Sequence, residues 1–165
     1  MRKTLFLTIA TQIKEHVPGI AHIDLWNEHL TTIQTETAWP VPSVFIEFGQ
    51  YNVKQLANHV YTADIPVHLH IITRAKPARR GIDDEQRFTE MLSYFDLIDR
   101  IHQVMVTIHS DTISTPMLTS STTNHNHGEL IESIESYTIA ARDLTAYRCT
   151  QNKRLDDINY IISRV

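Results

Sequence analysis

Pairs of histidines two residues apart are the side chains of this sequence best suited to binding a metal ion. His68 and His70 lie in an apolar segment, and His125 and His127 lie in a polar one. Strand residues at i and i+2 share a face with α-carbons about 6–7 Å apart, a spacing that metal sites use. Because no third or fourth ligand is fixed, chance pairing in a His-rich chain is the preferred interpretation. A metal-dependent hydrolase using His68 and His70 stays an alternative.

Residues for nucleophilic catalysis occur without the motifs that activate them. His109, Ser110 and Asp111 have the residue types of a catalytic triad, but the strained G-x-S-x-G turn is absent. The sequence also lacks the Gly-rich phosphate-binding motifs. Cys149, the only cysteine, has no context that predicts reactivity, and His102 is expected to be a hydrogen-bonded histidine at the core or its rim. The sequence therefore predicts neither an enzyme nor a cofactor.

A basic cluster is the most pronounced charge feature of the chain. It is followed directly by the acidic residues at 83–85. A mixed loop of this kind is either a solvated loop or a contact for a charged partner surface. The candidate contact residues are Arg74, Lys76, Arg79 and Arg80.

Composition indicates one globular domain. The chain has 165 residues, 42% of them hydrophobic and 21% charged, with a formal charge of −4. The acidic balance gives no electrostatic argument for nucleic acid or an anionic membrane, and no apolar run approaches the ~20 residues of a membrane span. We therefore expect no sequence-specific nucleic-acid binding, no membrane partner and a cytoplasmic origin.

The first half of the chain predicts one helix and several strands. Phe6, Ile9, Ala10, Ile13 and Val17 recur at helical spacing, and Pro18-Gly19 ends that helix. Residues 27–42 form a polar loop. Strands are expected at 20–26, at 43–48, at 51–60 with an irregularity near Ala57-Asn58, and at 65–73, where Ile65, Val67, Leu69 and Ile71 share one face.

A long helix and a hairpin are predicted in the second half. Asp83 is the candidate N-cap of a helix over 84–107, with Gln86 completing a variant of the capping box. Residues 113–123 are expected to be extended, 124–128 to form a turn, and 130–141 to form the closing strand, although helical spacing fits the last segment too. The expected buried stripe of the helix is Phe88, Met91, Leu92, Phe95, Ile98, His102 and Met105.

These elements predict an α+β fold, an antiparallel or mixed sheet of four to six strands with an N-terminal helix and one long helix packed on it. Residues 1–149 form the domain, and residues 150–165 are expected to be a C-terminal arm. The arm has too much apolar character to remain in solvent. It docks either on its own sheet or on a neighbouring subunit, through Ile158, Tyr160, Ile161 and Ile162.

Three segments resemble tail terminators and head–tail joining proteins of tailed phages and prophages. They are P-S-V-F-I-E-F-G-Q from Pro42, D-I-P-V-H-L-H-I-I-T from Asp64, and F-D-L-I-D-R-I-H-Q-V-M from Phe95. In element order the resemblance spans residues 6–143. The arm and the long polar stretch 110–127 depart from the family pattern.

The resemblance implies a structural protein of the virion, assembled in the host bacterial cytoplasm. Such proteins form a ring, commonly a hexamer, that stops the tail tube and contacts the tail-tube protein and the head connector protein. A ring uses heterologous interfaces between copies. A generic bacterial interaction domain is a further alternative.

Overall fold

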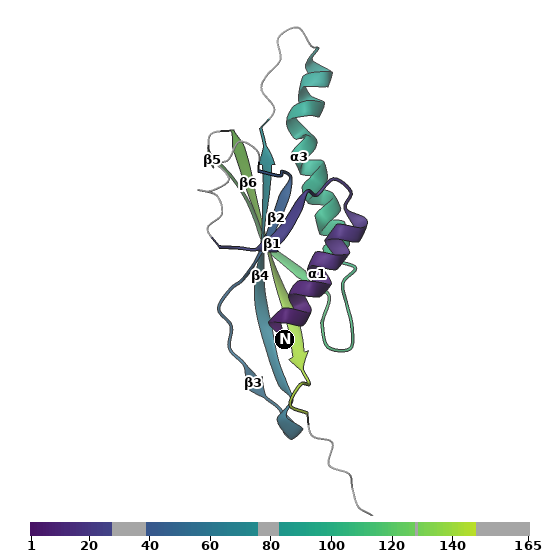
Figure 1. The fold of residues 1–165 in the computed structure, drawn as a ribbon, viewed down its shortest axis with the longest axis vertical. Helices are drawn as coiled ribbons and strands as arrows, with labels where there is room; N and C mark the ends of the chain where they lie inside the picture. The colour runs from purple at the N-terminus through teal and green to yellow at the C-terminus, as the bar shows by residue number, and fades with distance from the viewer. Residues whose placement is uncertain (28–38, 76–82, 128, 148–165) are drawn as a thin grey trace, which may run out of the picture.

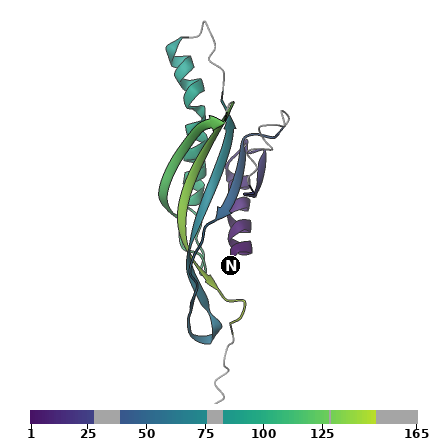
Figure 2. The same cartoon turned by 90° about the vertical axis from the view of Figure 1, so that its left-hand side faces the viewer.

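Within the described residues, six β-strands form one mixed sheet and two α-helices cover one of its faces (Figures 1 and 2). The structure is a computed structural model that describes residues 1–27, 39–75, 83–127 and 129–147. The elements are α1 (Arg2–His16), β1 (His22–Leu25), β2 (Ser43–Phe48), β3 (Lys54–Gln55), a 3₁₀ turn (Ala57–His59), β4 (Tyr61–Arg74), α3 (Asp84–Met105), β5 (Met117–His127) and β6 (Leu130–Asp143). The predicted α+β fold class is confirmed.

The strand order is β1-β2-β4-β6-β5, and β3 pairs with the beginning of β4. Only β1 and β2 pair in parallel, so the sheet is mixed. The centre of the sheet is the antiparallel pair of β4 and β6, in register from Tyr61 opposite Asp143 to Arg74 opposite Leu130. This pair therefore sets the length of the molecule.

The main core lies between the sheet and the two helices. Alternation along β4 directs every second side chain toward the helices, as the sequence predicts. The predicted buried stripe of α1 included Phe6, but Leu5 is the buried residue at that turn. Phe6 and Ala10 are partly buried and pack at the border of the core. The buried residues of this core include Leu5, Ile9, Ile13, Val44, Ile46, Ile65, Val67, Leu69, Ile71, Leu97, Ile98, Ile101, Met105, Tyr137 and Ile139.

A smaller cluster covers the opposite face of the sheet. Phe45, Ile72 and Leu130 are buried there against Trp26 and Trp39, which flank the loop between β1 and β2. Both sheet faces are thus partly covered. This explains why β2 reads as a continuous apolar run in the sequence.

The strand predicted over 51–60 is wrong for most of its length. Only Lys54–Gln55 pairs, as β3, before the chain turns at Ala57–His59 and enters β4. Asn58 and His59 have positive φ angles of 58° and 60°. Left-handed backbone cannot continue a strand, and this turn accounts for the irregularity predicted near Ala57-Asn58.

The turn predicted at 124–128 is wrong for its first four residues, which belong to a strand. β5 continues through His127, which pairs with Leu130 of β6. The strand predicted over 130–141 is confirmed as β6, because pairing with β4 on one side and β5 on the other outweighs its helical spacing.

Helix α3 begins as predicted and buries only part of its predicted stripe. Asp83 caps it by accepting a 2.8 Å hydrogen bond from the backbone N–H of Gln86. The buried residues are Leu97, Ile98, Ile101 and Met105, all in the C-terminal half. Phe88, Met91, Leu92 and Phe95 are exposed, so that half of the predicted stripe is wrong. The physical reason is that the helix runs past the end of the sheet, leaving its first turns without a surface beneath them (Figures 1 and 2).

Candidate interaction surface

The first half of α3 carries an uncovered apolar face. Phe88, Met91, Leu92 and Phe95 are 52, 55, 52 and 43% exposed and follow one another at i, i+3, i+4 and i+7. This spacing places them on one side of the helix, and we call these four residues the α3 face. An amphipathic helix is stabilised mainly by burial of such a face. A contiguous set of large apolar side chains in solvent is typical of an interaction site.

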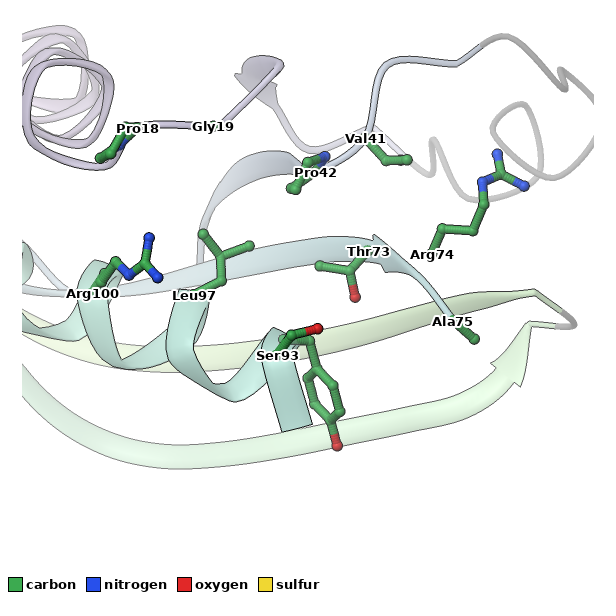
Figure 3. Close-up of a pocket in the computed structure, with 11 residues that line it drawn as sticks. Pro18, Gly19, Val41, Pro42, Thr73, Arg74, Ala75, Ser93, Leu97 and Arg100 are labelled. Atoms are coloured by element: carbon green, nitrogen blue, oxygen red, sulfur yellow. The ribbon is translucent and has the colours of Figure 1, made fainter. Parts of the chain in front are cut away.

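A hollow lies beside α3 where the helix meets the end of β4 (Figure 3). It has a volume of about 470 Å³ and is bounded by α3, by the turn after α1 and by the chain entering β2. Val41, Pro42 and Leu97 give it an apolar wall, and Arg74 and Arg100 stand at its border (Figure 3). A second hollow of about 270 Å³ adjoins it and shares Arg74 and Tyr94 with it. Met91 and Leu92 line this second hollow, so the α3 face borders it.

Thr73 places a polar atom in the wall of the larger hollow. Its side chain is buried, and its hydroxyl has no hydrogen-bond partner among the residues that the structure describes. Burying such a hydroxyl costs about 1–3 kcal/mol. A partner that supplied a carbonyl or hydroxyl group here would recover part of that cost.

Of the predicted basic cluster, the structure describes Arg74 alone. Its guanidinium lies 3.0 Å from the Glu129 carboxylate, and the two side chains are 37% and 81% exposed. Lys76, Arg79 and Arg80 lie outside the described residues, as do the arm residues Ile158, Tyr160, Ile161 and Ile162. Their assignment as contact residues stays a prediction.

The outer edge of the sheet is a second exposed surface. β5 pairs only with β6 among the described strands, and its residues from Met117 to Thr122 are exposed. An edge strand presents backbone N–H and C=O groups that a strand of another chain can pair with. In the described stretch 117–124 the side chains of β5 include no Lys and no Pro, the residues that commonly block such pairing.

The histidines predicted to share a strand face lie in a polar network. The ring of His70 is buried and stacks on Trp26 at 3.8 Å, with its two nitrogens 2.9 Å from Glu132 Oε1 and 3.0 Å from Glu47 Oε2. His68 is half-buried, and its Nδ1 lies 2.8 Å from the Ser136 hydroxyl. Both ring nitrogens of His70 thus contact carboxylates. In the described part of the chain, no group of three or more His, Cys, Asp or Glu side chains is arranged to hold a metal ion.

His102 behaves as the sequence predicts, as a hydrogen-bonded histidine at the rim of the core. Its Nδ1 lies 3.1 Å from the Tyr137 hydroxyl, which joins α3 to β6. Burial, and secondarily the charge of Glu135, raises the pKa of Tyr137 far above its usual value. The phenol therefore stays protonated, and its hydrogen bond with His102 is one between a neutral hydroxyl and the imidazole ring.

Two of the residues considered for a catalytic triad, His109 and Ser110, make local turn contacts. His109 Nδ1 lies 3.0 Å from the Thr107 carbonyl oxygen, and Ser110 contacts the Thr112 side chain. All of these groups are on the surface near the end of α3. Cys149 lies outside the described residues.

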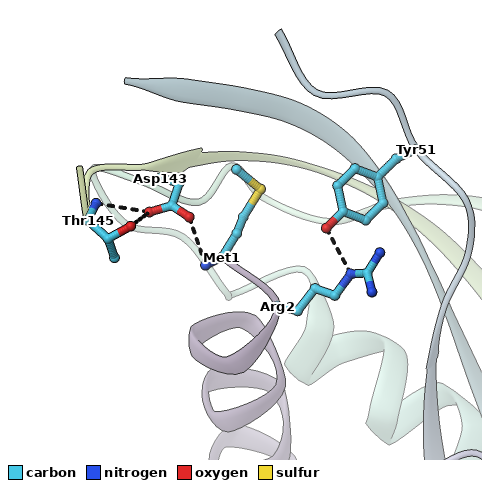
Figure 4. A network of polar contacts seen from close by, with 5 residues as sticks. All are labelled: Met1, Arg2, Tyr51, Asp143 and Thr145. Carbon is cyan, nitrogen blue, oxygen red and sulfur yellow. Dashed lines mark hydrogen bonds and ion pairs between the residues drawn. The ribbon is translucent and has the colours of Figure 1, made fainter. Parts of the chain in front are cut away.

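The end of the molecule opposite the α3 face is fixed by polar contacts (Figure 4). Arg2 donates a 2.9 Å hydrogen bond to the Tyr51 hydroxyl. The Asp143 carboxylate accepts hydrogen bonds from the Thr145 hydroxyl at 2.6 Å and the Thr145 N–H at 2.9 Å, and it lies 3.3 Å from the Met1 ammonium. These interactions, led by those of Thr145, lower the pKa of Asp143 to about 2.

Comparisons with known proteins show a likeness among solved structures. No family model and no curated protein matches the chain. One solved structure, described as "Virion of native gene transfer agent (GTA) particle", contains a similar chain at 10% identity and a TM-score of 0.48, covering 84% of this chain and 95% of that one. In the described residues, no helix is long and apolar enough to cross a membrane.

Proposed function

We propose that this chain is a structural protein of a phage-like virion, a tail terminator or head–tail joining protein that acts by forming a ring. The observation that carries the proposal is the α3 face, because four large apolar side chains together in solvent are typical of a surface that binds another protein. A binding module that assembles with copies of itself supplies that partner without a separate ligand.

The fold agrees with what the family resemblance implies. The three segments that carry the resemblance form β2, the centre of β4 and the C-terminal half of α3. Buried residues from all three belong to the main core, which leaves the first half of α3 and the β5 edge as exposed surfaces. We infer that the resemblance covers the scaffold of the protein, and that these two surfaces carry its contacts.

Two different surfaces on one chain are what a ring requires. In a cyclic assembly, one patch of each copy meets a different patch of the next. The α3 face and the arm can serve the contacts between copies. The β5 edge and the loop over residues 74–85, with Arg74, Lys76, Arg79 and Arg80, can contact the tail-tube protein or the head connector protein. The bound ring would stop growth of the tail tube because it exposes a surface unlike the end of the tube.

The mass of the protein in solution tests this proposal. Light scattering after size exclusion, across micromolar concentrations and at two salt concentrations, is expected to give one discrete species near six times the 19.1 kDa chain mass. A mass insensitive to salt would assign the contacts to apolar surfaces, and a salt-sensitive mass would assign them to the charged loop. A 19.1 kDa species under all conditions would contradict ring formation by this chain.

A further inference from the structure

We propose that residues 155–165 of one copy bind the α3 face of a neighbouring copy. This inference rests on the proposed function and names the two surfaces that join copies in the ring. In the sequence, Leu155, Ile158, Ile162 and Val165 recur at spacings of three and four, the spacing of one face of a helix. The α3 face also follows a helical period, so an apolar stripe of residues 155–165 in helical form can pack along it.

The length of the sheet prevents residues 155–165 from reaching the α3 face of their own copy. β6 ends opposite Tyr61, and the described chain leaves the sheet at that end (Figures 1 and 2). Met91 lies at the other end, where it lines a hollow together with Arg74. Between these ends lies the 14-residue strand β4, about 46 Å long at 3.3 Å per residue.

The arm is too short to span that distance with its apolar residues in place. Ile158 follows Tyr147 by 11 residues, which reach at most about 40 Å when fully extended. If residues 155–165 bind as a helix, only the residues before them can be extended, and the reach to the middle of that helix falls to about 33 Å. The arm therefore meets this surface on another copy.

Charge favours the arm over a second α3 as the occupant. Residues 84–100 carry five acidic and two basic side chains, whereas residues 148–165 carry four basic and two acidic ones. Packing two α3 faces against each other would bring like net charges together, and packing the arm there brings opposite charges together. The contact joins different patches of two copies, so it can be repeated around a ring.

Cross-linking between two distinguishable copies tests the contact. In a Cys149→Ser background, one copy carries Leu92→Cys and a size tag, and the other carries Ile158→Cys without the tag. After the copies are co-produced and oxidised, we expect a disulfide-linked species with the mass of one tagged and one untagged chain. The matched control replaces Leu92→Cys by Leu7→Cys, which is 51% exposed on α1 against 52% for Leu92, and should give no such species.

Each other outcome overturns the inference in a recognisable way. A linked pair of two tagged chains would identify a second α3 as the occupant of the face. A chain that carries both cysteines and closes a disulfide within itself would assign the site to its own arm. A ring-sized mass with no mixed cross-link would refute this contact and leave the proposed function standing, whereas a monomeric mass would refute the proposed function itself.

A substitution in the arm gives a second readout. Ile158→Asp should weaken assembly by about ten- to a hundred-fold in the dissociation constant, because it places a charge where the proposed contact buries an apolar side chain. Asn159→Asp adds the same charge at a neighbouring position outside the apolar stripe, and it should leave the dissociation constant within about two-fold. Equal losses for both variants would show that the charge of the arm, and not its apolar face, makes the contact.

Discussion

Asp143 connects the end of β6 to the start of α1 through charge-dependent contacts. Its carboxylate accepts two hydrogen bonds from Thr145 and faces the Met1 ammonium. These contacts favour the ionised form and lower its pKa to about 2 in the folded protein, against about 3.9 in the unfolded chain. Stability from this group is therefore fully present above pH ~4 and is lost as the pH falls toward ~2.

Asp143→Asn tests this pH dependence. Because the carboxylate is partly exposed, solvent screening reduces its contribution, and we expect the variant to lose about 1 kcal/mol in the free energy of unfolding at pH 6. The difference from wild type should vanish near pH 2, as measured by urea unfolding across pH. Asp111→Asn, on an exposed turn, is the control. A constant difference between pH 6 and pH 2 would contradict the role of the charge.

The buried network around His70 gives a second residue-scale prediction. His70→Ala removes the stacking on Trp26 and two contacts with carboxylates, and it should lower the free energy of unfolding by about 2 kcal/mol or more. His68→Ala, at a half-buried position with one contact to Ser136, should cost roughly 1 kcal/mol or less. Urea unfolding of both variants measures the difference. Equal losses, or loss of a stoichiometric metal ion in either variant, would favour the metal-site alternative.

At the scale of elements, the two halves of α3 should respond differently to the same kind of substitution. Ile101→Ala opens a cavity in the main core and should cost about 2–5 kcal/mol in the free energy of unfolding. Leu92→Ala, on the exposed half, should change that free energy by about 0.5 kcal/mol or less when measured at concentrations where the protein is monomeric. A large loss for Leu92→Ala under those conditions would mean that the α3 face is packed within its own chain.

Elements with a regular pattern could be predicted from the sequence, and their limits in space could not. The alternation of Ile65, Val67 and Leu69 identifies β4, and Asp83 marks the start of α3. Helical spacing continues unbroken through Phe88 and Leu92, but spacing does not say where the sheet beneath a helix ends. The half of α3 that is a candidate interaction surface was for that reason predicted to be core.

The hydrogen-bond partners of His68 and His70 could not be predicted from the sequence, for a related reason. The spacing of His68 and His70 places them on one strand face, as found. Their partners Ser136 and Glu132 come from β6, more than 60 positions later, and only the register of β4 against β6 brings them together. Local patterns carry no information on that register.

For the whole molecule, the described chain presents an apolar helix face at one end, and β6 ends opposite Tyr61 at the other. This polarity suits a head-to-tail assembly better than a two-fold dimer, in which the same patch would have to meet itself. In the proposed assembly, the β5 edge takes no part in the contacts between copies and is left for other partners.

The most direct test of this account is the mass in solution of Leu92→Glu beside wild type and Leu7→Glu. The two variants place the same charge on equally exposed leucines, one in the α3 face and one on α1. Light scattering after size exclusion should give a ring-sized mass for wild type and Leu7→Glu, and 19.1 kDa for Leu92→Glu. A ring-sized mass for Leu92→Glu, or a monomeric wild type, would contradict assembly through the α3 face.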